Sequence, residues 1–330
     1  MTYTSLIYQT FGKPDQVLTA VETAYPTISF DQCVVQMILC PINPSDLIPM
    51  TGAYAHRIPL PQVAGYEGVG KVIEVGRPID EHLLGKLVLP LKSNGTWQQV
   101  VLAKTADLII LPDFISIEDA AQAYINPITA LLLCKSELNL SKGDTLLVNA
   151  CNSSIGRILI QLSTILGFQL IAVVRNGKYK EELLALGAAF VIATDESQLI
   201  EEVMQVTNGQ GVSAAIDSIG GIDGTNLAKC VRKQGDFIPI GLLSGQQVDW
   251  ELIFGLEISA RIFHLRHWAD RVSNTEWQGA FQQLFGYIKD GNLKLGKLEG
   301  VYDFLDYRQA LTDALDDRVK GKVFLRFAKE

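Results

Sequence analysis

The sequence predicts an α/β protein in which a doubly wound parallel sheet is joined to a second, β-rich part. From about residue 143, apolar runs alternate with helix-like stretches in units of about 25 to 30 residues, the spacing of parallel strands joined by crossover helices. Before residue 125, short apolar runs are separated by Pro and Gly, which is typical of shorter β-strands joined by turns. The length of 330 residues exceeds the usual size of one hydrophobic core. Two domains are therefore expected.

The β-rich domain is expected to comprise residues 1–123 and 290–330. Short apolar runs bounded by turn residues predict strands of a barrel-like or sandwich-like domain. The C-terminal segment GKVFLRF predicts a closing strand that this domain borrows from the tail. The predicted strands are residues 33–39, 70–75, 86–89, 97–102 and 321–327.

The doubly wound domain is expected to span residues 124–289. Its predicted strands are residues 144–150, 169–174, 190–193, 213–217 and 235–241, and its predicted helices are residues 155–166, 179–186, 198–206 and 224–231. After Gly241 the pattern loosens. A strand at 258–263 and an amphipathic helix at 274–288 are still predicted there.

Composition excludes several classes of function. Hydrophobic residues make up 48% and charged residues 19% of the chain, which excludes a disordered or coiled-coil protein, and the formal charge of −8 argues against a nucleic-acid surface. No stretch reaches the roughly 18 apolar residues of a membrane span, and the N-terminus lacks a basic leader. We therefore expect a small-molecule partner, with neither nucleic acid nor membrane as a partner.

Cysteine usage indicates a reducing compartment. The five cysteines are scattered and contain no C-x-x-C pair, so they predict reduced, buried thiols and a cytoplasmic location.

The segment VNACNSSIG, residues 148–156, lies between an apolar run and a helix-like stretch. A dinucleotide-binding protein carries its glycine-rich phosphate turn at such a place. Here serines replace glycines, while a glycine remains where strand and helix must touch. An ordinary helix N-cap is the alternative interpretation. The candidate cofactor-binding residues are Asn152, Ser153, Ser154, Ile155 and Gly156.

The next predicted strand ends at Arg175, and no acidic residue appears before Glu181. NAD sites present Asp or Glu at this strand end, whereas a guanidinium suits the 2′-phosphate of NADPH. The pattern therefore predicts NADPH as the cofactor, with a solvated arginine as the alternative. Gly220 and Gly241 follow later strands, where glycine admits a close ligand or simply makes a turn.

Four stretches together resemble a known superfamily. They are INPSD with TGAY (42–46 and 51–54), VAGYEGVGKVIEVG (63–76), YINPITA (124–130) and NACNSSIGRILIQLSTILGFQLIAVVRN (149–176). The chain resembles the medium-chain dehydrogenase/reductase superfamily, and within it the mitochondrial-type trans-2-enoyl thioester reductases, followed by the quinone oxidoreductases. The resemblance implies a Rossmann domain with a GroES-like catalytic domain, and a homodimer formed through an edge strand near residues 258–263.

Two departures from the family pattern bear on the site. Ser154 stands where the enoyl reductases have glycine, and its Cβ would crowd the pyrophosphate slightly. Zinc alcohol dehydrogenases of the superfamily have a Cys ligand and a Gly-His-Glu segment where this chain has NPSD and Gly65, Tyr66 and Glu67. Catalytic zinc needs three protein ligands, so no metal is expected.

The resemblance also implies site residues in both domains. Tyr54 matches the family's proton or hydrogen-bond donor, and Asn43 with Asp46 would orient the loop beside it. Asn126 would lie at the nicotinamide side, unless it is only a helix cap. The implied acyl pocket includes Phe263, His264 and Trp268, although the family has Trp where His264 stands.

Together these features predict a zinc-independent, NADPH-dependent reductase of polarised C=C bonds, acting on trans-2-enoyl thioesters with Tyr54 as donor. A quinone oxidoreductase on the same fold is the first alternative. A non-catalytic NADPH-binding protein is the second.

Overall fold

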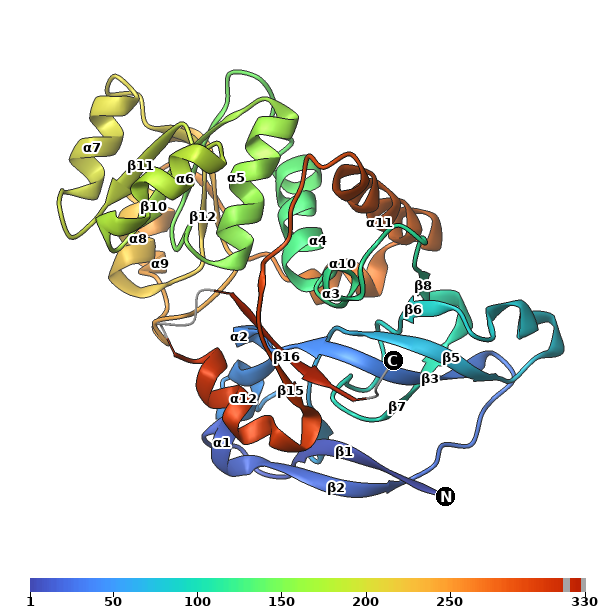
Figure 1. Cartoon of the computed structure of the whole chain (residues 1–330). Helices are drawn as coiled ribbons and strands as arrows, with labels where there is room; N and C mark the ends of the chain where they lie inside the picture. The colour runs from blue at the N-terminus through green and yellow to red at the C-terminus, as the bar shows by residue number, and fades with distance from the viewer. Residues whose placement is uncertain (317–320, 328–330) are drawn as a thin grey trace. The chain divides into compact units, whose positions relative to one another are not determined.

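Two structural units make up the chain in the computed structural model, which describes residues 1–316 and 321–327. Unit 1 consists of Met1–Ile125, Val272–Lys289 and Leu295–Glu330, and unit 2 consists of Asn126–Arg271 and Asp290–Lys294. Figure 1 shows the helices and strands of each unit.

Unit 2 is built on a six-stranded sheet with the strand order β11-β10-β9-β12-β13-β14. Every neighbouring pair in it is parallel. The strands are β9 (Thr145–Val148), β10 (Gln169–Val174), β11 (Phe190–Ala193), β12 (Val212–Asp217), β13 (Val231–Pro239) and β14 (Ser259–Ala260). Because the chain runs from β9 outward in both directions, the sheet has a topological switch point between β9 and β12, where open α/β sheets bind ligands.

Crossover helices connect these strands, as expected for parallel pairs. They are α5 (Ser154–Leu166), α6 (Lys180–Leu186), α7 (Leu199–Val206), α8 (Gly221–Lys229) and α9 (Trp250–Phe254), and α10 (Leu265–Arg271) follows β14. The strand interiors are apolar on both faces because both faces are covered. Leu146, Leu147 and Val148 of β9, for example, are fully buried.

Unit 1 contains a seven-stranded sheet and a three-stranded sheet. The larger sheet consists of β3 (Gln32–Pro41), β5 (Val69–Val75), β6 (Leu87–Leu89), β7 (Val100–Lys104), β8 (Ile109–Ile110), β15 (Leu298–Asp303) and β16 (Lys322–Arg326). The smaller sheet consists of β1 (Thr2–Tyr8), β2 (Leu18–Ala24) and β4 (Gln62–Val63). The C-terminal strand β16 pairs antiparallel with β3, so the expectation that the tail closes this domain is confirmed.

Helices of unit 1 are mostly short. They are α1 (Pro14–Val17), α2 (Pro44–Leu47), α3 (Ile117–Ala121), α11 (Asn274–Lys289) and α12 (Tyr307–Ala314), and α4 (Ile125–Leu132) begins on the last residue of the first segment.

The helix α11 belongs to unit 1, whereas the sequence placed residues 274–288 in the doubly wound domain. Its aromatic face explains the difference. The indole of Trp277 donates to the Asp107 carbonyl at 3.2 Å, and its ring meets that of Tyr124 edge to face with centroids 5.7 Å apart. The amide of Gln278 donates to the Leu108 carbonyl at 3.0 Å. The expected boundaries between the β-rich and the doubly wound domain, at residues 123 and 290, stay a prediction.

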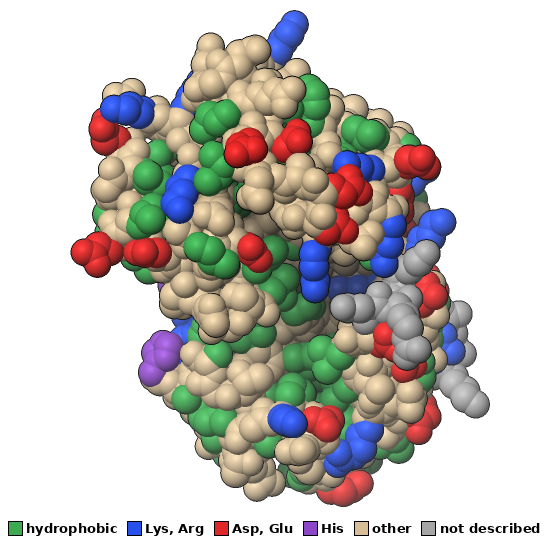
Figure 2. Space-filling view, turned by 90° about the vertical axis from the view of Figure 1, so that its left-hand side faces the viewer, with side chains coloured by type: hydrophobic (Ala, Val, Ile, Leu, Met, Phe, Trp, Pro, Cys, Tyr) green, Lys and Arg blue, Asp and Glu red, His purple; other side chains and the backbone are tan. Residues whose placement is uncertain are grey.

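The visible surface mixes charges of both signs. Figure 2 shows acidic and basic side chains interspersed on the face that it presents, without an extended basic patch there. Among the residues that the structure describes, no helix combines the length and apolarity needed to cross a bilayer.

Candidate active site

The predicted phosphate turn follows β9 directly. Ala150 adopts a positive φ of 50°, and the Cys151 N–H donates to the Val173 carbonyl of β10 at 3.2 Å. Ser153 is the N-cap of α5, because its hydroxyl accepts from the Gly156 N–H at 3.3 Å. The N-cap interpretation of Ser153 therefore holds, and it leaves the phosphate-binding prediction open, since both can be true of one turn.

Gly156 is where turn and helix touch. A Cβ on this residue would lie 2.5 Å from the Cα and 2.7 Å from the carbonyl oxygen of Cys151. Helix geometry leaves the first-turn N–H groups of Ser154 and Ile155 without carbonyl partners inside α5, and the helix dipole adds positive potential there. The turn is thus suited to an anion such as a pyrophosphate.

An arginine that the sequence did not single out stiffens this turn. The Nε of Arg157 donates to the Asn152 carbonyl at 3.1 Å, and its two terminal nitrogens hold the Glu182 carboxylate at 2.7 and 3.0 Å. The turn is thereby tied to α6. The sequence does show an arginine directly after Gly156. It does not show that this arginine pairs with Glu182, which lies 25 positions away.

Arg175 directly follows β10, and its side chain is exposed. Its carbonyl accepts from the Asp195 N–H at 3.1 Å, which fixes the backbone at the end of the strand. The nearby acid Glu196 is paired with Lys180 at 2.5 Å. Within the described part of the chain, the Arg175 guanidinium makes no ion pair, so its charge remains available to a ligand.

A buried hydrogen bond joins the end of β12 to the residue that follows β9. The amide of Asn149 donates to Asp217 at 2.5 Å and accepts from the Ser218 N–H at 2.8 Å. Asp217 also accepts from the N–H groups of Ile219 and Gly220, at 2.9 Å and at 3.0 to 3.1 Å. Burial raises the pKa of the Asp217 carboxyl, and these hydrogen bonds oppose the shift. The pair therefore shapes the loop at the switch point.

The predicted glycines lie on the same edge of the sheet. Gly220 has a φ of 78°, which favours glycine, and a Cβ on Gly241 would lie 2.7 Å from the Ser218 carbonyl oxygen. These contacts are with protein backbone, so they explain both glycines as turn residues. Their contact with a cofactor stays a prediction.

The three predicted pocket residues also belong to unit 2. Phe263 is buried, and its N–H donates to the Pro239 carbonyl at the end of β13 at 3.1 Å. The rings of His264 and His267 meet edge to face with centroids 5.0 Å apart. Trp268 lies on α10, one helical turn after His264. Within residues 1–316 and 321–327, no group of three or more His, Cys, Asp or Glu side chains is arranged to hold a metal ion.

Unit 2 therefore places many predicted residues at the carboxyl ends of its parallel strands. These are Asn152, Ser153, Ser154, Ile155 and Gly156 after β9, Arg175 after β10, Gly220 after β12, Gly241 after β13 and Phe263 after β14. Asn126 lies in the first turn of α4.

Unit 1 holds Asn43 and Tyr54. Asn43 is buried and begins α2 with a capping box, in which its N–H donates to Asp46 at 2.8 Å. Tyr54 is half-buried on the turn after the 3₁₀ helix Ile48–Thr51, and the guanidinium carbon of Arg57 lies 4.1 Å from its ring centroid. The Tyr54 hydroxyl has no hydrogen-bond partner within the described residues and so can donate to a ligand.

Ser45 is a residue that the sequence did not single out. Its hydroxyl, in the NPSD segment, is buried without a hydrogen-bond partner among the described residues. Ser45 belongs to the NPSD motif, but a sequence does not show which hydroxyl will lack a hydrogen-bond partner in the fold. Leaving a buried hydroxyl unpaired is unfavourable, so Ser45 is a further candidate for contact with a ligand.

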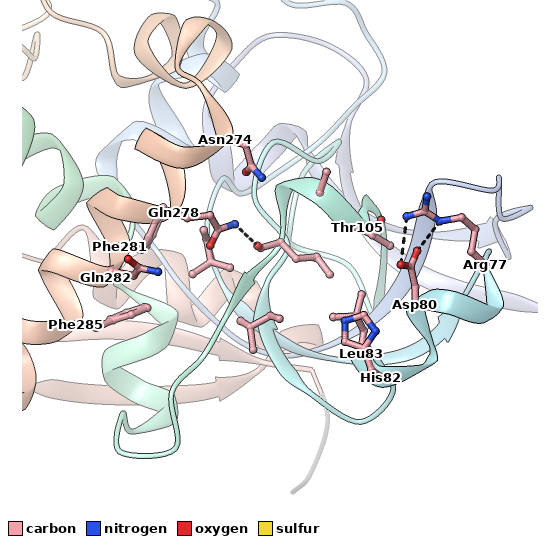
Figure 3. Close-up of a pocket in the computed structure, with 14 residues that line it drawn as sticks. Arg77, Asp80, His82, Leu83, Thr105, Asn274, Gln278, Phe281, Gln282 and Phe285 are labelled. Atoms are coloured by element: carbon pink, nitrogen blue, oxygen red, sulfur yellow. Dashed lines mark hydrogen bonds and ion pairs between the residues drawn. The ribbon is translucent and has the colours of Figure 1, made fainter.

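A separate pocket of about 540 Å³ lies within unit 1. Figure 3 shows Asn274, Gln278, Phe281 and Phe285 of α11 on one side and Arg77 ion-paired with Asp80 on another. The Gln278 amide already donates to the Leu108 carbonyl. None of the residues predicted from the sequence lines this pocket, so we assign it no part in the candidate site.

Comparison with known proteins gives matches along the whole chain. A family model described as "Alcohol dehydrogenase GroES-like domain" matches residues 29–113, and one described as "Zinc-binding dehydrogenase" matches residues 154–285. A mitochondrial enoyl-[acyl-carrier-protein] reductase of Caenorhabditis elegans is 35% identical over 334 residues, which cover 97% of this chain and 94% of that protein.

Solved structures agree with these matches. A Bacillus thuringiensis protein, provisionally described as an NADPH:quinone reductase, is 48% identical, has a TM-score of 0.96 and covers 99% of both chains. A mycobacterial protein in complex with NADPH is 25% identical, with a TM-score of 0.87 and coverage of 98% of this chain and 99% of that one. The predicted pairing of a GroES-like with a Rossmann domain is thereby confirmed.

Proposed function

Since the chain belongs to the medium-chain dehydrogenase/reductase superfamily, we propose that it is an NADPH-dependent reductase of polarised C=C bonds, acting on trans-2-enoyl thioesters. The observation that carries the proposal is the turn closed by Gly156, followed at the next strand end by the Arg175 guanidinium, which makes no ion pair with any residue that the structure describes. The enoyl reductase relative supports the substrate class.

The residues present fit NADPH. The turn from Asn152 to Gly156 would receive the pyrophosphate, because its first-turn N–H groups are unpaired inside the helix. Arg175 would pair with the 2′-phosphate. The backbone near Gly220 and Gly241 would line the path towards the nicotinamide, beside Asn126. When bound, NADPH supplies a hydride to the β-carbon of the conjugated double bond.

Residues of unit 1 would complete the reduction. The hydroxyl of Tyr54 donates a hydrogen bond or a proton as negative charge develops on the enolate, and the proton ends on the α-carbon. Asn43 and Asp46 hold the start of α2, from which the chain leads to Tyr54. The acyl pocket would include Phe263, His264 and Trp268. No metal takes part in this scheme, because the enolate is stabilised by hydrogen bonding.

The proposed activity is tested by NADPH oxidation with crotonyl-CoA, with a naphthoquinone and without an acceptor. We expect turnover with crotonyl-CoA that exceeds turnover with the quinone. Turnover with the quinone alone would favour a quinone oxidoreductase, which the 48% identical Bacillus thuringiensis protein makes the second candidate. NADPH binding with no turnover of either acceptor would indicate a non-catalytic protein.

Replacing Arg175 by alanine should raise the Kd for NADPH roughly tenfold, because a charge-assisted hydrogen bond at an exposed site contributes about 1.5 kcal/mol. The Kd for NADH should change little. Both constants can be measured by fluorescence titration. Arg232, which is also exposed and lies near the amino-terminal end of β13, provides the control Arg232→Ala. An equal loss for both cofactors would show that Arg175 does not bind the 2′-phosphate.

The proposal extends to assembly and location. Strand β14 ends the six-stranded sheet and pairs only with β13 in the described chain, so a second copy can continue the sheet there and form a homodimer. Light scattering of the purified protein tests this. All five cysteines are free and buried, which supports a cytoplasmic location.

A further inference from the structure

Unit 1 contains a buried series of hydrogen-bonded polar side chains, of which the scheme above uses only Asn43. The Lys322 ammonium donates to Asn43 Oδ1, and Asn43 Nδ2 donates to Glu67 Oε1 at 2.7 Å. The second oxygen of Glu67 accepts from the backbone N–H groups of Tyr124 and Ile125, at 3.0 and 2.8 Å. Relative exposure is only 1% for Asn43 and Glu67 and 6% for Lys322.

The two charged ends, Lys322 and Glu67, fix the direction in which the hydrogen bonds between these side chains run. An ammonium can only donate hydrogen bonds, and an ionised carboxylate can only accept them. Asn43 lies between them and must therefore turn its oxygen to Lys322 and its nitrogen to Glu67. Either charged end alone is enough to orient the Asn43 amide, so only neutral residues at both ends would remove this constraint.

The Lys322 ammonium offsets part of the negative charge of two buried carboxylates. Asp46 lies beside the series of side chains and accepts from the N–H groups of Asn43 and Tyr66, at 2.8 and 3.0 Å. Burial raises the pKa of Asp46 to about 7 and also raises that of Glu67, while the charge of Lys322 lowers both. Burial lowers the pKa of Lys322, and the two carboxylates oppose that shift. A buried carboxylate whose cation is removed is strongly destabilised.

Glu67 provides the cap of α4. The residues just before this helix, Ala123 and Tyr124, have no short polar side chain that could accept from its first N–H groups, whereas Ser116 and Ser153 cap α3 and α5 locally. The acceptor for α4 is therefore a carboxylate from 57 or 58 positions earlier in the sequence. Asn126 is the next residue after the two that Glu67 holds.

We propose that Lys322 is a positioning residue, whose buried charge keeps Glu67 ionised and thereby fixes the start of α4 and the place of Asn126. The same series of side chains holds Asn43 at the start of α2, which leads to Tyr54. One cation thus sets two segments of the proposed site. The catalytic part of this inference rests on the proposed function, whereas the structural part does not.

The test compares the wild type with Lys322→Gln, Glu67→Gln and the double variant. In Lys322→Gln the new amide can still donate to Asn43, but the charge is lost. In Glu67→Gln an amide nitrogen must face either the Asn43 nitrogen or the two backbone N–H groups. In the double variant the Asn43 amide can turn over, so that two glutamines and an asparagine form a satisfied neutral chain.

We expect both single variants to unfold at a lower temperature than the wild type, and the double variant to unfold at a higher temperature than either single one. Amide hydrogen exchange should speed up at Tyr124 and Ile125 in Lys322→Gln. With crotonyl-CoA, kcat of this variant should fall roughly tenfold, because small displacements of a positioned group are costly, while the Kd for NADPH stays within about twofold. Lys104→Gln, an exposed change at the end of β7, is the control.

Additive unfolding effects, or unchanged exchange at Tyr124 and Ile125, would overturn the proposal. A lowered unfolding temperature with unchanged kcat would also overturn it, since Lys322 would then be structural only. If the wild type reduced neither crotonyl-CoA nor a quinone, the proposed function would fail. The unfolding temperatures of the wild type and the three variants, with amide hydrogen exchange at Tyr124 and Ile125, would still decide whether Lys322 fixes the start of α4.

Discussion

Replacing Gly156 by alanine should raise the Kd for NADPH by about 100-fold, because binding would have to restore the original turn against an overpacking cost of up to about 3 kcal/mol. The added Cβ would lie 2.5 Å from the Cα of Cys151, and the nearest atoms are all backbone. The Cys151 N–H is itself bonded to Val173 of β10. Helix α5 would therefore have to move away from the turn, taking the first-turn N–H groups of Ser154 and Ile155 with it.

The measurement is a fluorescence titration of NADPH, with thermal unfolding recorded on the same samples. Gly286→Ala in α11 is the matched control, because a Cβ there meets no atom within 4 Å and alanine favours a helix interior. If Gly156→Ala bound NADPH as tightly as the wild type, the turn could not be the pyrophosphate site. Ser154→Gly should act in the opposite direction and tighten binding modestly, since it removes a Cβ beside the same N–H groups.

Local periodicity was sufficient to predict most of unit 2. The runs at residues 169–174 and 190–193 coincide with β10 and β11, because the strands of a parallel sheet are mostly apolar on both faces. The predicted strand 258–263 is only Ser259–Ala260 in the structure. It pairs with β13 at the edge of the sheet, where fewer hydrogen bonds extend a strand.

Long-range pairings were not predictable in the same way. The two strands β1 and β2 are half-exposed, with alternating burial along β2, and helix α1 lies between them in the sequence. Lys322 and Asn43 are 279 positions apart, so no local pattern connects them. Likewise, the sequence shows Asp217 only as the last residue of a predicted strand, and its hydrogen bond from Asn149 is seen only in the structure. Such buried polar partners become visible only when the fold brings their elements together.

Tyr54→Phe should lower kcat with crotonyl-CoA by roughly ten- to a thousandfold, the range for loss of one proton or hydrogen-bond donor. The substitution removes a hydroxyl that has no partner in the described structure and keeps the ring on which Arg57 packs, 4.1 Å from its centroid. The fold of the turn should therefore persist. NADPH binding should be unchanged, because the proposed cofactor residues lie in unit 2.

Tyr25→Phe is the matched control, since Tyr25 is also a half-buried tyrosine of unit 1 and the change removes a hydroxyl that donates to Glu74 at 3.3 Å, away from the residues of the proposed site. Steady-state kinetics separate the possible results. A fall in kcat with little change in KM indicates an interaction made mainly in the transition state. A rise in KM alone would mean that Tyr54 only binds substrate, and an unchanged kcat would remove it from the mechanism. A quinone acceptor adds a further distinction, because its reduction depends less on one defined proton donor and should lose less activity in Tyr54→Phe.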